Sequence, residues 1–448
     1  MNSIISIKLI VLLILLSSNV IFGQSNFSLK EAQEYALKNN IQVKNALIDI
    51  QKAKKKIWET AAMGLPQISG AIDYTYMPTV PEMQFAVVTH GELQPDGKTV
   101  SLNSMNVPIK LGVPHSFTFT ATASQLLFSG SYIVGLQTSK TFKKLSEQSL
   151  EMSKNDVIEN VSNTYLMVLA VEENKSLLKA TSDNMNKTLV ELKAMFAEGL
   201  IENTDVDQLQ YTVSNIDNAY KMLERQTEIA YRLLKFQMGM DLDQEIELTD
   251  NLKDILAGIE MESMMAYQFD INRNITYQLL NTQESLQNSL VKLEKSNYLP
   301  TFAAFYQHQE KPNKADFDFT FPDIIGASLS IPIFSSGMRN AKVDQANMEL
   351  EKTQNTKSMA IQGIKLEVQQ AQITLQSSYE KFVNEKTNQD LAKRIYDKTL
   401  IKYKEGMVSS MDLSQANSQY LNAQTNYFNA LVEVLQAKNK LDNLLNNK

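Results

Sequence analysis

The sequence contains no cysteine. This absence excludes disulfide bonds, thiolate nucleophiles and cysteine metal ligands. It also leads us to expect no lipid anchor on an N-terminal cysteine. The fold must therefore be stabilised by packing and hydrogen bonding alone.

Proline is scarce and confined to two windows. All ten prolines lie within residues 66–114 and 300–332. Because proline interrupts helix interiors, the proline-free runs 131–198 and 338–405 each predict a long helix, about 100 Å at 1.5 Å per residue. The two proline-containing windows are expected to hold another structure.

Positive charge and metal-binding patterns are also lacking. The net charge is -7, and the three histidines have no metal-ligand spacing. Nucleic-acid affinity depends on positive charge, so we expect no nucleic-acid partner. The sequence has no nucleophile elbow, phosphate loop, dinucleotide fingerprint or zinc-protease motif. We therefore expect no metal, cofactor or catalytic residue, and a protein that is not an enzyme.

The N-terminus has the pattern of a secretion signal. Lys8 precedes the apolar run 9–16, and a stretch of small and polar residues leads to Gly23. This run is too short to span a bilayer, which requires about 20 apolar residues. We predict a cleavable signal peptide at 1–23.

One short stretch occurs twice, at 196–210 (FAEGLIENTDVDQLQ) and 403–417 (YKEGMVSSMDLSQAN). Each copy ends a helical pattern at a glycine and starts another a few residues later. We predict two helical hairpin tips.

The segments after both tips have coiled-coil spacing. Apolar residues recur there at alternating steps of three and four. After the first tip these are Val206, Leu209, Val213, Ile216, Tyr220 and Leu223; after the second they are Leu413, Ala416, Tyr420, Ala423, Tyr427, Ala430, Val434, Ala437, Leu441 and Leu444. The spacing predicts long helices packed side by side.

The proline windows alternate apolar and small polar residues, which is typical of strands. The apolar members are Ile68, Ile72, Tyr74, Tyr76, Phe117, Phe119, Ala121 and Ala123 in the first window, and Phe302, Ala304, Tyr306, Ile325, Ala327, Leu329 and Ile331 in the second. Four strands with one apolar face fit either a soluble sandwich or a membrane barrel. Single-chain barrels begin at about eight strands, so a barrel would need several chains.

The order of these pieces resembles the TolC-type outer-membrane efflux proteins over essentially the whole mature chain. The opening helix FSLKEAQEYALKNNIQVKNA, the strand entry WETAAMGLPQISGAIDYTY, the strand-to-helix motifs SQLLFSG and LSIPIFSSGMRNAKVDQA, and the link FQMGMDLDQEIEL carry the resemblance. It implies a mainly α fold with a small transmembrane β part and two internal repeats. Three protomers would form a twelve-stranded β-barrel continued by a twelve-helix α-barrel.

The expected domain boundaries follow from the repeats. The first repeat covers 24–238, with a β-hairpin at 66–130 and the tip 196–210. An equatorial link covers 239–261. The second repeat covers 262–448, with a β-hairpin at 299–337 and the tip 403–417.

The resemblance implies an export duct in the outer membrane of a Gram-negative bacterium, extending into the periplasm. Its partners would be two further copies, outer-membrane lipid, a periplasmic adaptor and an inner-membrane transporter of the RND or ABC type. A secreted or surface coiled-coil adhesin or scaffold without a lumen remains the alternative.

The family's gate lies at the second tip, and Tyr403 and Asp412 match its tyrosine and first aspartate. Val408 and Gln415 stand where the family has an arginine and a second aspartate, which argues against the family's ion-pair latch. Asp205 and Asp207 are further gate candidates at the first tip.

The acidic residues at the tips also have a structural explanation. Thr204 to Asp207 and Ser409 to Asp412 each fit a capping box, which stabilises a helix N-terminus. Capping and gating are compatible roles.

The corners Gly199-Leu200 and Gly406-Met407 are candidates for contact with the adaptor. Both glycines are also explained as helix terminators with positive φ.

The first proline window is longer than the second. Its surplus segment, residues 77–114, predicts an extended extracellular loop or a tolerated insertion without a function.

Overall fold

The computed structural model describes residues 25–93, 95, 97–98, 100–257, 269–315 and 318–445. The expected signal peptide at 1–23 and the end of the expected link, 258–261, lie outside the described residues. None of the described helices is long and apolar enough to cross a membrane.

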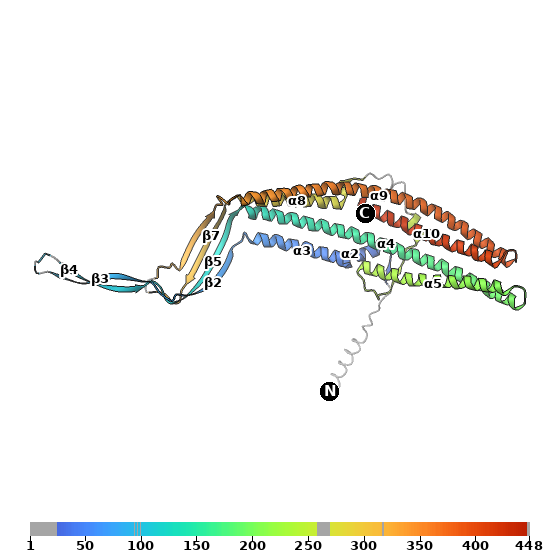
Figure 1. The fold of residues 1–448 in the computed structure, drawn as a ribbon, viewed down its shortest axis with the longest axis horizontal. Helices are drawn as coiled ribbons and strands as arrows, with labels where there is room; N and C mark the ends of the chain where they lie inside the picture. Colours follow the sequence, from blue (N-terminus) through green and yellow to red (C-terminus); the bar gives the residue numbers. More distant parts are fainter. Residues whose placement is uncertain are drawn as a thin grey trace, which may run out of the picture. The chain divides into compact units, whose positions relative to one another are not determined.

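Helices make up most of the chain (Figure 1). In order, the elements are β1 (Ser25–Phe27), α2 (Leu29–Asn39), α3 (Ile41–Ala62), β2 (Gln67–Tyr76), β3 (Glu82–Leu93), β4 (Val100–Lys110), β5 (His115–Ser129), α4 (Gly130–Ala197), α5 (Asn203–Met238), β6 (Ile246–Leu248), α6 (Leu252–Ala257), the 3-10 helix η1 (Ile271–Arg273), α8 (Ile275–Ser296), β7 (Thr301–Glu310), β8 (Asp323–Ser330), α9 (Met338–Lys404) and α10 (Ser410–Leu445). Helices α4 and α9 are the two long helices expected from the proline-free runs.

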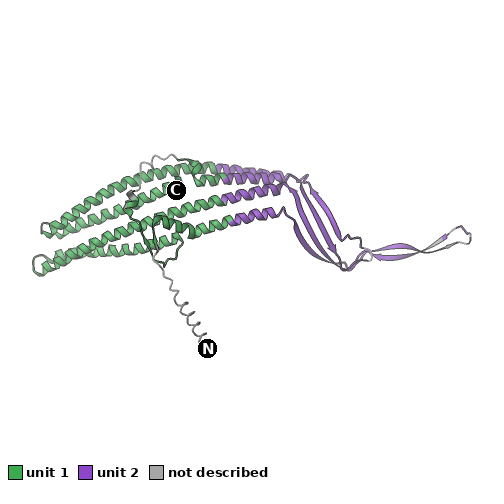
Figure 2. Cartoon of the chain, turned by 180° about the vertical axis from the view of Figure 1, so that it is seen from behind, with its two compact units in different colours: residues 1–50, 146–281, 356–448 green, residues 51–145, 282–355 purple. Residues whose placement is uncertain are grey.

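The chain divides into two compact units, and each takes residues from both halves of the sequence (Figure 2). Unit 1 comprises residues 1–50, 146–281 and 356–448, and unit 2 comprises residues 51–145 and 282–355.

The core of unit 1 is built from the apolar stripes of its helices. Near the tips, α4, α5, α9 and α10 all contribute, with Met185, Leu209, Tyr396 and Leu413 among the buried members. The coiled-coil positions expected on α5 and α10 are all buried or partly buried, because each helix lies against neighbours along its apolar stripe.

Helix α10 buries a wider face than the expected stripe. Asn417, Gln424, Phe428, Leu431 and Leu435 lie outside that stripe and are also buried. A helix covered on more than one side by neighbours buries more than a two-position stripe.

One polar side chain within this face donates a hydrogen bond to the next helix. The Gln424 amide Nε2 donates to Asn174 Oδ1 on α4 at 2.9 Å. A pairing of this kind offsets the cost of burying an amide.

A short parallel strand pair ties the start of unit 1 to its later part. Strand β1 pairs with β6, so that Ser25 lies opposite Ile246. The hydroxyl of the fully buried Tyr165 of α4 lies within hydrogen-bond distance of two acceptors, the Phe27 carbonyl at 2.9 Å and Asp250 Oδ2 at 3.1 Å, which share its one proton. Burial raises the pKa of the Tyr165 hydroxyl, so it remains a donor.

Unit 2 contains a four-stranded antiparallel sheet in the order β2-β5-β7-β8. These are the four strands expected from the alternating pattern. Residues that face each other across an antiparallel pair share a face, so the pairs Ile72–Phe119 and Tyr74–Phe117 lie on one side. The predicted apolar face is therefore present.

The surplus segment 77–114 is more ordered than the expected loop. Strands β3 and β4 pair antiparallel over Glu82–Leu93 and Val100–Lys110 and form a separate two-stranded sheet. The segment connects β2 to β5, as expected, but it consists largely of paired strands. Its alternation of apolar and polar residues favours strands despite the flanking prolines.

Candidate functional site

Both hairpin tips, which lie in unit 1, end their first helix in the same way. Gly199 and Gly406 have φ of 72° and 71°, the left-handed conformation that favours glycine. At the first tip, Leu200 N donates to Met195 O and Gly199 N donates to Phe196 O. This is a Schellman motif.

The second tip repeats this bonding pattern. Met407 N donates to Lys402 O at 2.9 Å and Gly406 N donates to Tyr403 O at 3.0 Å. The helix-terminating role predicted for both glycines is confirmed. Each places an apolar side chain outward at the corner, since Leu200 is 70% exposed and Met407 is 73% exposed.

Hydrogen bonds join the two tips through the N-terminal turns of α5 and α10. The buried Ser410 hydroxyl lies 2.6 Å from Asp205 Oδ1 and 3.1 Å from Gln208 Oε1. One turn further along, the Thr212 and Ser414 hydroxyls lie 2.9 Å apart. Asp205 therefore connects one hairpin to the other, a contact that the single-tip motifs did not indicate.

Asp412 is bonded within its own tip. Its Oδ2 accepts from the Ser409 amide at 3.0 Å and from the Ser409 hydroxyl at 2.7 Å, and the Asp412 amide lies 3.2 Å from Ser409 Oγ. This is the predicted capping box. The side-chain and backbone hydrogen bonds from Ser409 lower the pKa of Asp412 below its usual value.

The capping box predicted from Thr204 to Asp207 is wrong. Helix α5 begins at Asn203 with Glu202 as its N-cap, and the Glu202 side chain makes no capping hydrogen bond. Thr204 therefore already lies inside the helix. Asp207 instead accepts from the Asn203 amide Nδ2 at 2.8 Å.

Tyr403 lies half-buried at the second tip, packed against the apolar cluster shared by the four helices. Burial, together with the negative charge of Asp205, raises the pKa of Tyr403 to about 12. The hydroxyl therefore keeps its proton, and Asp205 is close enough to influence both Tyr403 and Ser410.

An ion pair near the tips involves residues that the motif comparison did not single out. Lys404 Nζ on α9 lies 3.2 Å from Glu191 Oε2 on α4. Both side chains are about half-exposed, so solvent weakens their attraction. This ion pair joins two helices. The family's ion-pair positions, Val408 and Gln415, carry no charge in this chain.

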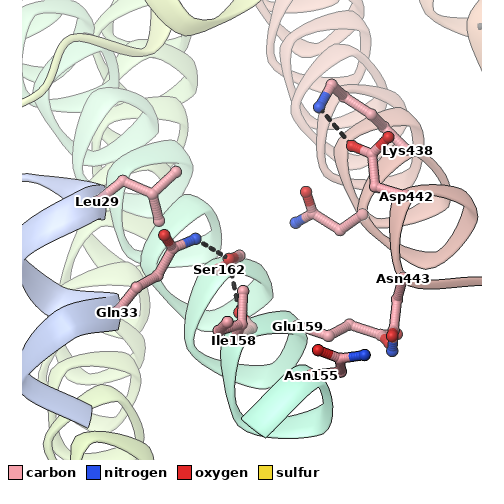
Figure 3. Close-up of a pocket in the computed structure, with 10 residues that line it drawn as sticks. Leu29, Gln33, Asn155, Ile158, Glu159, Ser162, Lys438, Asp442 and Asn443 are labelled. Carbon is pink, nitrogen blue, oxygen red and sulfur yellow. Dashed lines mark hydrogen bonds and ion pairs between the residues drawn. The ribbon is translucent and has the colours of Figure 1, made fainter. Parts of the chain in front are cut away.

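A pocket of about 350 Å³ lies among α2, α4 and α10, within unit 1 (Figure 3). Its polar side chains largely satisfy one another: Gln33 donates to Ser162 at 2.8 Å, and Lys438 pairs with Asp442 at 2.8 Å. Among the residues described, no three His, Cys, Asp or Glu side chains gather to form a metal site.

The sheet of unit 2 exposes its apolar face. One row crosses all four strands through Ile68, Ala123, Tyr306 and Ile325. The outer members of this row, Ile68 and Ile325, are 83% and 84% exposed. Exposed apolar side chains in a contiguous set mark a surface that another molecule or a lipid phase covers.

An aromatic cluster lies on this face at the end of β2. The Tyr76 and His115 rings stack with centroids 4.9 Å apart, and the Tyr74 hydroxyl lies 2.9 Å from His115 Nδ1. The opposite face of the sheet is polar and hydroxylic: Ser69 pairs with Thr122, and Thr122 pairs with Gln307.

Comparison with known proteins gives three kinds of agreement. A family model described as outer membrane efflux protein matches residues 33–240 and 278–447. The outer membrane protein TolC of Salmonella enteritidis is 23% identical over 340 residues, which cover 71% of this chain. The chain spans 61% of the length of that curated relative.

Solved structures agree in fold. The Campylobacter jejuni CmeC outer membrane channel matches with a TM-score of 0.70 at 18% identity, covering 93% of this chain and 85% of that chain. The Neisseria gonorrhoeae MtrE outer membrane channel, solved in its open state, matches with a TM-score of 0.69 at 14% identity, covering 93% and 88%.

These findings confirm the resemblance and the mainly helical fold class expected from the sequence, together with the outer membrane as the location. Because the family model matches most of the length of the chain, the assignment does not depend on one motif. The chain belongs to the outer membrane efflux protein family.

Proposed function

We propose that this protein is the outer-membrane export duct of a tripartite efflux or type I secretion system. Three copies would share one twelve-stranded β-barrel in the outer membrane and continue it as a twelve-helix tunnel through the periplasm. Substrates would pass outward through this conduit. The observation that carries the proposal is the sheet of unit 2, with one exposed apolar face and one hydroxylic face.

The edges of this sheet support sharing between chains. Among the residues that the structure describes, β2 and β8 each pair on one side only. Four strands cannot close a barrel, whereas three chains supply twelve and leave no edge unpaired. The ten-residue strands β2 and β7 match the length that a transmembrane strand requires.

The tips support a gate. Asp205 bonds to Ser410 of the other hairpin, and its charge acts on Tyr403. Asp412 and Asp207 bond within their own hairpins and would add a ring of negative charge where three copies meet on one axis. In this proposal, hydrogen bonds and packing take the place of the family's ion-pair latch, because Val408 and Gln415 stand at its arginine and second aspartate positions.

The exposed corners support docking of a partner at the same end. Leu200 and Met407 extend outward from glycines that present no side chain of their own. We assign these four positions to contact with a periplasmic adaptor, which links the duct to an inner-membrane RND or ABC transporter.

A coiled-coil scaffold or adhesin is the competing function. A scaffold would explain the helices. It would not explain a sheet that exposes Ile72 on one side and small hydroxylic residues on the other. A scaffold would also be extracted from cells without detergent, whereas a duct requires detergent.

Single-channel conductance in planar bilayers tests the duct and its gate. We expect small current steps from the wild type and larger steps from Asp205→Ala and Asp412→Ala, because each change loosens the tips. Asp183→Ala is the matched control: Asp183 is exposed on α4 and pairs with Lys179 on the same helix. Its steps should equal those of the wild type.

Each outcome has a distinct meaning. Equal steps from all four proteins would keep the duct and reject the tip aspartates as its gate. Larger steps from Asp205→Ala alone would restrict Asp412 to capping. Absence of current from folded protein of every variant would reject the duct and favour the scaffold.

A further inference from the structure

Strands β3 and β4 form a two-stranded ribbon with a marked difference between its faces. Cross-strand neighbours Met83–Ile109, Phe85–Val107 and Val87–Met105 lie on one face, which we call the apolar ribbon face. The opposite face carries the pairs Glu82–Lys110, Gln84–Pro108, Ala86–Asn106 and Val88–Ser104. The segregation follows from strict alternation along both strands.

The apolar ribbon face has no cover within the described residues. Phe85 is 45% exposed and Met105 is 58% exposed. An isolated two-stranded hairpin is marginally stable in water. A ribbon of this length with an apolar face is therefore expected to pack against something.

We propose that the apolar ribbon faces of the three protomers pack against one another and form a β-structured collar above the barrel. This inference depends on the trimer of the proposed function. It assigns the surplus segment 77–114, beyond its expected place as a loop or a tolerated insertion, to an interface between copies of this chain.

Lipid is a poor occupant for this face. The paired residues of β2, Gln67–Tyr76, already reach the length that spans a membrane. Their far end carries the cluster of Tyr74, Tyr76 and His115, the position at which barrels place their interfacial aromatic residues. The ribbon follows this cluster in the chain and thus lies beyond the apolar band (Figure 1).

A second copy is favoured by chemistry and by local concentration. The apolar ribbon face consists of uncharged aliphatic, methionine and phenylalanine side chains, so it is complementary to itself. A twelve-stranded barrel is on the order of 25 Å across, which places the bases of three ribbons roughly 20 Å apart. At that spacing the effective concentration of one ribbon for another is millimolar or higher.

The connections to the four-stranded sheet hold each ribbon together at its base. Residues 77–81 and 111–114 join the ribbon to β2 and β5, and two backbone hydrogen bonds close these joints: Met77 N donates to Pro114 O at 2.8 Å, and Leu111 N donates to Pro81 O at 2.9 Å. The two strands of one ribbon therefore stay together where the four-stranded sheet ends and the separate two-stranded sheet begins.

The absence of native cysteine makes a direct test possible. We would introduce Phe85→Cys on the apolar ribbon face and Ala86→Cys, its neighbour on the opposite face, as the matched control. The detergent-purified trimer would be treated with a short bis-maleimide and the products separated under denaturing conditions. Because adjacent strand residues point to opposite sides, we expect cross-linked dimers from Phe85→Cys in roughly tenfold excess over the control.

A second pair protects the test against a variant that fails to fold. Met105→Cys lies on the apolar ribbon face and Asn106→Cys on the opposite face, so their cross-linking yields should differ in the same direction. Equal yields within both pairs, or no cross-linking in protein of trimeric mass, would overturn the collar and leave the duct standing. A monomeric mass for folded protein would overturn the duct as well.

The remaining outcome identifies another occupant. If Phe85→Cys resists a water-soluble monofunctional maleimide yet yields no cross-linked dimers, a lipid or a different molecule covers the face. That result would also overturn packing between copies.

Discussion

Gly406 and Gly199 have positive φ but face open space: a side-chain carbon added at either position would meet no neighbour within 4 Å. The constraint at both is therefore conformational. Gly363, within α9, also has open space around it but keeps helical geometry. Replacing glycine with alanine should consequently have opposite effects at the tip and in the helix.

We predict that Gly406→Ala destabilises the second tip by about 1–2 kcal/mol, because an L-residue is strained in the left-handed region. Gly363→Ala, the control, should stabilise α9 by roughly 0.5–1 kcal/mol. Amide hydrogen exchange of residues 402–409 would report the first effect. Unchanged exchange in Gly406→Ala would contradict the Schellman geometry.

Asp412 predicts a dependence of tip stability on pH. Hydrogen bonds from Ser409 lower the folded-state pKa of this carboxyl below 3.8. Its stabilisation is therefore complete above the unfolded pKa and is lost as the pH falls through the folded pKa. We predict that Asp412→Asn has a lower thermal midpoint than the wild type at pH 7 and that the difference shrinks as the pH falls below the unfolded pKa. A difference that stays constant as the pH falls through this range would contradict an ionised cap.

At the scale of elements, Tyr165 connects three segments. Its hydroxyl reaches both the end of β1 and Asp250, and Asp250 in turn accepts from the Leu29 amide at 2.7 Å. The buried ring and these bonds attach the β1–β6 pair to the middle of α4. Helix α4 therefore depends on a polar anchor as well as on its apolar stripe.

We predict that Tyr165→Phe destabilises unit 1 by about 0.5–1.5 kcal/mol, because it removes a buried hydrogen-bond donor. The loss is limited because the Phe27 carbonyl still accepts from the Thr249 amide and Asp250 from the Leu29 amide. Tyr211→Phe on α5, where the ring is 69% exposed, is the control and should change stability by less than about 0.5 kcal/mol. Thermal unfolding in detergent, followed by circular dichroism, would compare the two. Equal midpoints would reject the anchor.

At the scale of the whole molecule, the two faces of the sheet determine how the chain meets the membrane. Ile72 lies midway along β2 on the apolar face, and Ala71 lies beside it on the hydroxylic face. In the proposed barrel the first contacts lipid and the second lines the lumen.

We predict that Ile72→Arg costs about 2–4 kcal/mol of membrane insertion, whereas Ala71→Arg is tolerated. The fraction of folded trimer recovered in the outer-membrane fraction would measure both. Equal recovery of the two variants would indicate that the apolar face does not contact lipid.

Patterns within short stretches of the sequence determined the long helices, the four-stranded sheet and the helix ends at the tips. The confined prolines predicted α4 and α9, alternation predicted the four-stranded sheet and its apolar side, and the repeated glycine corners predicted both helix ends. Each of these features depends on residues that are close in sequence, where backbone sterics and periodicity are decisive. Motif order predicted the family.

The tertiary structure decided what distant residues do to one another. It placed Asp205 against Ser410, and it covered Gln424 on α10, because neighbouring helices enclose more than one apolar stripe. The capping-box spacing from Thr204 to Asp207 placed the N-cap of α5 at Thr204, which lies inside the helix. The many turn residues in the first proline window obscured the β3–β4 pair. Hydrogen-bond partners across helices and strand pairing require the positions of residues far apart in the chain, and periodicity does not encode these positions.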